Sequence, residues 1–90
     1  MERIEVIVSG RVQGVSFRAF ALQIALSLGL KGFVRNLAND SVEAVAEGKK
    51  EKIEKFLIEL QKGPPLCNVE NISVTRSKAI NEFSDFEIRY

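Results

Sequence analysis

The sequence contains no histidine, and Cys67 is its only cysteine. A serine or cysteine nucleophile activated by histidine is therefore excluded. Histidine-ligated metal sites and zinc sites built from cysteine pairs are excluded for the same reason. No disulfide can form within one chain, which fits a reducing compartment. Any reaction at this protein has to proceed without a conventional general base.

The sequence also lacks an excess of either charge and a long apolar run. Its 13 basic and 12 acidic side chains give a formal net charge of +1, so any anion-binding site must be local. The longest apolar region, residues 19–30, is interrupted by Gln23 and Ser27 and is too short to span a bilayer. The N-terminal residues carry charges where a signal peptide needs apolar side chains. We therefore expect a cytoplasmic protein that binds neither membranes nor nucleic acids.

Apolar periodicity predicts a single domain over residues 1–90, with five strands and two helices. Alternating apolar residues indicate the strands, and apolar residues three and four positions apart indicate the helices. The predicted order is a strand over residues 4–9, a helix over 16–28, strands over 33–36 and 41–47, a helix over about 49–62, and strands over 72–76 and 86–90. Val69 stands out of phase with Ile72 and Val74 of the fourth strand.

This β-α-β-β-α-β order with a terminal strand predicts an α+β fold, the ferredoxin-like split β-α-β sandwich. Right-handed crossovers place both helices on one face of an antiparallel sheet. Because this fold supports metal binders, RNA binders, regulators and enzymes, it does not by itself indicate a function.

The loop between the first strand and the first helix has the features of an anion site. Gly10 and Gly14 permit positive φ angles and a close approach of the backbone to a ligand. Ser16 stands at the expected N-cap, so unpaired N–H groups and the positive end of the helix dipole face the loop. Arg18 falls in the first turn, where a cation is unfavourable unless an anion binds beside it. Its guanidinium group matches two phosphoryl oxygens in shape.

The same residues carry a family resemblance that extends over nearly the whole chain in order. The run Ser9-Gly10-Arg11-Val12-Gln13-Gly14-Val15-Ser16-Phe17-Arg18 resembles the acylphosphatase signature, whose Gly-x-Val-Gln-Gly-Val-x-Phe-Arg loop binds phosphate. The later segments Gly32-Phe33-Val34-Arg35-Asn36, Ser41-Val42-Glu43, Glu47-Gly48, Gly63-Pro64-Pro65 and Phe86-Glu87-Ile88 are also similar to the family. Asn39-Asp40 departs from it, because a glycine-containing turn is usual there, and this affects the expected rate or stability rather than the activity.

The resemblance implies an enzyme that hydrolyses small-molecule acyl phosphates to a carboxylate and inorganic phosphate. Arg18 takes the position of the phosphate-binding arginine, and Asn36 that of the asparagine that orients the attacking water. The remaining loop residues would offer backbone amides to the phosphoryl group: Arg11, Val12, Gln13, Gly14, Val15, Ser16 and Phe17. No metal and no cofactor is expected, phosphate should be both product and competitive inhibitor, and the protein should be a monomer.

The absence of histidine fits this chemistry. An acyl phosphate expels a carboxylate, which is weakly basic and needs no proton from the enzyme. Phosphoryl transfer through a loose transition state depends mainly on positioning and on charge stabilisation at the equatorial oxygens. Arginine, backbone amides and an asparagine-held water can provide both.

Two alternatives remain open at this stage. A non-catalytic or carbamoyl-phosphate-handling module of similar sequence would use the same loop within a pathway rather than for free hydrolysis. An RNA-binding module of the same topology would stack bases on aromatic residues of its central strands. The corresponding segments here, residues 4–9 and 41–47, contain no aromatic residue, which disfavours RNA binding.

Overall fold

The computed structural model describes residues 1–14 and 16–90 and contains every predicted helix and strand. Several of the strands extend beyond their predicted ends. The elements are β1 (Glu2–Arg11), α1 (Phe17–Ser27), β2 (Lys31–Asn36), β3 (Val42–Gly48), α2 (Lys50–Lys62), β4 (Asn68–Lys78) and β5 (Phe86–Arg89). None of the helices in the described part of the chain is long and apolar enough to cross a membrane.

The strands form one sheet in the order β4-β1-β3-β2-β5. The pairs β4–β1, β1–β3 and β3–β2 are antiparallel, as the ferredoxin-like prediction requires. β5 pairs with β2 in parallel, so the complete sheet is mixed. The predicted fold is confirmed, and β5 is the edge strand of the sheet, next to β2.

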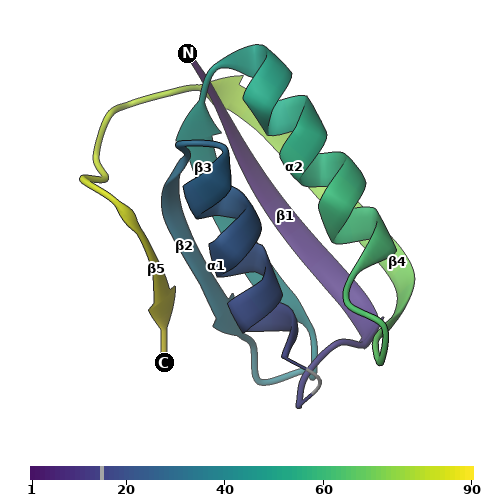
Figure 1. Cartoon of the computed structure of the whole chain (residues 1–90). Coiled ribbons are helices and arrows are strands. Elements are labelled where there is room, and N and C mark those ends of the chain that lie inside the picture. The colour runs from purple at the N-terminus through teal and green to yellow at the C-terminus, as the bar shows by residue number, and fades with distance from the viewer. Residues whose placement is uncertain (15) are drawn as a thin grey trace.

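Both helices cover the same face of the sheet, and the core lies between them and the strands (Figure 1). The alternation in β1 buries Ile4, Val6 and Val8 completely. The helical spacing in α2 buries the apolar face that it predicts, formed by Ile53, Phe56, Leu57 and Leu60. Each fully buried side chain of this kind contributes about 1.5–3 kcal/mol through removal from water.

A bulge between β1 and β4 explains the phase break at Val69. Ser9 pairs with Asn71, but Gly10 pairs with Val69, so Glu70 is an extra residue on β4. An extra residue reverses the alternation of faces beyond it. Val69 and Ile72 therefore both pack against the core although they are three positions apart.

A buried carboxylate holds the connection between β4 and β5 against the sheet. Glu47, at the end of β3, accepts hydrogen bonds from the N–H groups of Ile80 (3.0 Å) and Asn81 (2.9 Å) and from Arg3 Nη1 (3.0 Å). Burial by itself raises the pKa of Glu47, but the hydrogen bonds from Ile80, Arg3 and Asn81 outweigh it and lower that pKa. The carboxylate thus fixes the segment that delivers β5 to the sheet edge.

Strand direction determines where the candidate site lies. Because β1 and β2 both run antiparallel to β3, they run in the same direction, and β5 runs with them. Their carboxyl ends therefore meet at one edge of the sheet, where Figure 1 also shows the start of α1. The β1–α1 loop, the last residue of β2 and the C-terminus come together there.

Candidate active site

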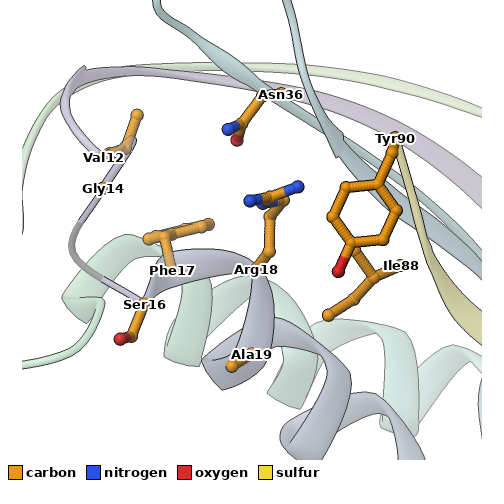
Figure 2. A pocket seen from close by; sticks show the side chains of 9 residues that line it. All are labelled: Val12, Gly14, Ser16, Phe17, Arg18, Ala19, Asn36, Ile88 and Tyr90. Carbon is orange, nitrogen blue, oxygen red and sulfur yellow. The ribbon is translucent and has the colours of Figure 1, made fainter.

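A cleft of about 340 Å³ opens at this edge. Its walls come from the β1–α1 loop, the first turn of α1, the end of β2 and the C-terminal strand. The lining residues are Val12, Gly14, Ser16, Phe17, Arg18, Ala19, Asn36, Ile88 and Tyr90 (Figure 2).

The loop reaches the helix through an unusual backbone conformation. Gly14 has φ 73° and Ser16 has φ 65°, so both are left-handed. For a serine this conformation is uncommon and unfavourable, and residues held in it cluster at functional sites. Ser16 occupies the predicted N-cap position, but its side chain makes no capping hydrogen bond. Ser16 therefore stands at the predicted N-cap position but does not cap the helix with its side chain.

The start of α1 leaves hydrogen-bond donors for a ligand. Phe20 N–H donates to Ser16 O at 3.0 Å. No hydrogen bond between described residues uses the N–H groups of Gly14, Ser16, Phe17 or Arg18. Unpaired N–H groups at a helix N-terminus bind anions, and the helix dipole strengthens that binding.

Arg18 lies in the first turn of α1 and is half-buried. Its guanidinium group stacks on the ring of Tyr90, with Cζ 4.9 Å from the ring centroid. No ion pair in the described part of the chain includes Arg18. The first turn of α1 holds no acidic residue either. A cation held by an aromatic ring, at the positive end of a helix, is suited to pairing with an anionic ligand.

Asn36 is the last residue of β2 and faces Arg18 across the cleft (Figure 2). Its side-chain oxygen is buried and has no hydrogen-bond partner among the described residues. Buried polar atoms are nearly always hydrogen-bonded, and an exception points to a missing water or ligand. Within the described part of the chain, the cleft therefore presents an acceptor without a donor opposite a cation without an anionic partner.

The predicted loop residues do not all line the cleft. Arg11 ends β1, is exposed and pairs with Asn68 of β4. Val12 lines the cleft, but its N–H donates to Gly10 O at 3.1 Å. Gln13 turns its side chain toward the β2–β3 connection instead. Val15 lies outside the described residues, while Gly14, Ser16, Phe17 and Arg18 meet Asn36 at the cleft.

Sequence reasoning missed Ile88 and Tyr90 as cleft residues. The alternation at Phe86, Ile88 and Tyr90 already places all three on one face of β5. The alternation does not show which strand β5 pairs with. Its pairing with β2 is what brings Ile88 and Tyr90 to the cleft beside α1. Tyr90 is 98% exposed, so it contributes a wall to the cleft rather than packing to the core.

No three His, Cys, Asp or Glu side chains gather in the described part of the chain in a way that could hold a metal ion. The polar groups at the cleft are backbone N–H groups, a guanidinium group and an amide. This donor set suits an oxyanion rather than a cation.

Comparisons with known proteins identify the family. The Acylphosphatase family model matches residues 4–88. The acylphosphatase of Syntrophotalea carbinolica is 47% identical over 88 residues, which cover 98% of this chain and 96% of that protein. The crystal structure of acylphosphatase from Bacillus subtilis superposes with a TM-score of 0.97 at 38% identity and covers 100% of both chains. Full-length HypF, in its phosphate- and nucleotide-bound form, gives a TM-score of 0.85 at 31% identity, with all of this chain matching 12% of HypF. The chain therefore belongs to the acylphosphatase family of hydrolases.

Proposed function

We propose that this protein hydrolyses acyl phosphates in the cleft between α1 and the end of β2. The phosphoryl group binds to Arg18 and to the backbone N–H groups at the start of α1. Asn36 holds the water that attacks phosphorus. The observation that carries this proposal is that one cleft is lined by two groups: the Arg18 guanidinium group, which forms no ion pair with a described residue, and the buried Asn36 oxygen, which has no hydrogen-bond partner among those residues.

The reaction forms a bond between the water oxygen and phosphorus and breaks the bond between phosphorus and the carboxyl oxygen. Negative charge is spread over the three equatorial oxygens in a loose transition state. In this proposal the Arg18 guanidinium group and the loop amides stabilise that charge as donors aimed at the phosphoryl oxygens. The carboxylate leaves with its electron pair and takes no proton from the enzyme.

Asn36 acts on the water rather than on the phosphate. Its unpartnered oxygen accepts a hydrogen bond from the water and so restricts the direction of attack, which lowers the entropic barrier. An amide is too weak a base to remove the proton at an early stage. The proton passes late in the reaction to a phosphoryl oxygen, and no phosphoenzyme forms.

Hydrolysis of benzoyl phosphate in excess chelator tests the proposal. We expect full turnover without divalent ions and competitive inhibition by inorganic phosphate. Loss of all activity on chelation would show that a metal is required. In ¹⁸O-labelled water the label should enter phosphate and not benzoate, because attack is at phosphorus; label in benzoate would contradict the mechanism.

We also propose that the protein acts as a monomer in the cytoplasm, on acyl phosphates free in solution. Sedimentation at assay concentration tests this. Comparison of the turnover of carbamoyl phosphate with that of benzoyl phosphate distinguishes a general hydrolase from a specialised module.

A further inference from the structure

The side chain of Gln13 joins two parts of the candidate site that are far apart in the sequence. Its Nε2 donates one hydrogen bond to Leu37 O at 2.8 Å and another to Ser41 O at 2.9 Å. A primary amide has two N–H donors, so both are used. Gln13 itself belongs to the β1–α1 loop and is half-buried.

The two acceptors flank the connection between β2 and β3. Leu37 directly follows Asn36, and Ser41 directly precedes β3. Leu37 N–H donates to Ser41 O at 2.8 Å and closes the turn between them. Gln13 therefore bonds to both ends of the turn that directly follows Asn36.

No other hydrogen bond in the described residues ties the loop over residues 12–16 to this turn. Without the Gln13 amide, Ser41 O keeps its bond from Leu37, but Leu37 O loses the donor that the described residues give it. A half-buried carbonyl without a donor shifts toward water. The residue next to Asn36 would therefore move.

We infer that Gln13 is a positioning residue, which sets the distance and direction between the phosphoryl site and Asn36. The inference rests on the proposed function, because it matters only if one side of the cleft binds phosphate and the other side holds water. Gln13 touches neither. It acts through Leu37 and the turn, and displacements of about 1 Å in such an arrangement reduce turnover by up to about 100-fold.

The first test separates positioning from binding. Gln13→Met keeps the length of the side chain and removes both donors. For benzoyl phosphate we expect kcat to fall at least about tenfold, while the inhibition constant of inorganic phosphate stays within about threefold of wild type. Equal losses in kcat and phosphate affinity would overturn the inference, and so would an unchanged kcat.

The second test compares how kcat changes with pH in a variant and in wild type, so a difference in their folded fractions that is the same at each pH does not affect it. In Gln13→Glu an ionised carboxylate faces two carbonyl oxygens, which raises its pKa, and the protonated form can donate one hydrogen bond. The ratio of the variant's kcat to the wild-type kcat should rise at least about threefold as pH falls from about 8 to about 5. Gln23→Glu, the same change at an exposed position of α1, should give a flat ratio. A flat ratio for Gln13→Glu would refute the role.

A double-mutant cycle shows whether Gln13 acts through Asn36. In the Asn36→Ala background, Gln13→Met should change kcat less than about twofold, because the residue to be positioned is gone. Additive losses would overturn the inference. If wild type itself did not hydrolyse benzoyl phosphate, the proposed function would fail; a wild type that turns over with the Gln13 variants unaffected would overturn the positioning role alone.

Discussion

Replacement of Asn36 by leucine should make the protein more stable and nearly inactive. The oxygen of Asn36 is buried and has no hydrogen-bond partner among the described residues, and such an atom costs about 1–3 kcal/mol of folding free energy. Leucine has the same number and branching of side-chain heavy atoms and no polar atom, and its bulkier methyl groups extend into the open cleft beside Asn36. Because Asn36 is only half-buried as a residue, we take the lower end of this range, about 1 kcal/mol. For a domain of this size that corresponds to a rise in Tm of about 4–8 °C.

The same substitution removes the group that holds the attacking water. We expect kcat for benzoyl phosphate to fall at least about 100-fold. The inhibition constant of phosphate should stay within about threefold, since Arg18 and the α1 N–H groups are untouched. Thermal denaturation followed by circular dichroism and steady-state kinetics on the same preparation measure both effects.

A matched control separates this effect from a general preference of strands for leucine. Asn71 on β4 is exposed and pairs with Ser9. Asn71→Leu should change stability by no more than about 0.5 kcal/mol and leave kcat unaltered. If Asn36→Leu lowered Tm, the oxygen of Asn36 would have to be satisfied in the resting protein. If it retained more than about a tenth of the wild-type kcat, the water would be held elsewhere.

Three further predictions, one of which compares two glycines, test other parts of the structure. Arg18→Met should raise the inhibition constant of phosphate and lower kcat, each at least about tenfold, with no loss of stability by urea denaturation, because a cation leaves the first turn of α1 and no ion pair is broken. A marked loss of stability would instead give Arg18 a structural role. Gly10→Ala should destabilise the fold by at least about 2 kcal/mol, since φ is 119° and a Cβ would collide with the β4 backbone at Asn68. At Gly14, with φ 73° and open space, alanine should cost about 1 kcal/mol, and equal costs at the two positions would contradict the collision. The pKa of Glu47 is lowered on folding, so its contribution to stability is present above its ordinary value of 4.5 and is lost as pH falls below it. Glu47→Gln should therefore flatten the acid limb of the stability curve, and an unaltered limb would show that other carboxylates dominate it.

Apolar periodicity predicted β1 and α2 well because each lies against the core on one face. The inner face of α2 and the alternation of β1 follow directly from this one-sided burial. The phase break at Val69 indicated an irregularity in the fourth strand, but only the pairing of β4 with β1 shows that Glu70 is the extra residue of a bulge. Periodicity could not give the parallel pairing of β5 either, since strand order depends on contacts between distant segments.

The candidate site divides in the same way. The position of Arg18, in the first helical turn after a glycine-containing loop, indicated an anion site from the sequence alone. Asn36 was found only through the family resemblance. The roles of both residues stay predictions. The sequence shows Gln13 as one loop residue among several, and nothing near it in the chain indicates its bonds to Leu37 and Ser41. The alternation predicts the face on which Tyr90 lies. Its stacking on Arg18 depends on the pairing of β5 with β2, which the sequence does not show. The sequence therefore predicts which residues of the loop could bind an anion, but not the contacts that these residues make with other helices and strands.

Three residues of the cleft are each locally unfavourable for the stability of the fold. Ser16 is held in a left-handed conformation, Arg18 places a cation at the positive end of a helix, and Asn36 buries an oxygen to which no described residue donates a hydrogen bond. At the opposite end of the sheet, by contrast, Glu47 is buried with three hydrogen bonds, of which the one from Arg3 is also an ion pair. A bound phosphoryl group with its water would compensate the cation and occupy the free acceptor together. Since one ligand offsets both defects, a substitution that removes either defect from the free protein should also remove what the ligand binds or aligns, and this is why stability and turnover should change in opposite directions at Asn36.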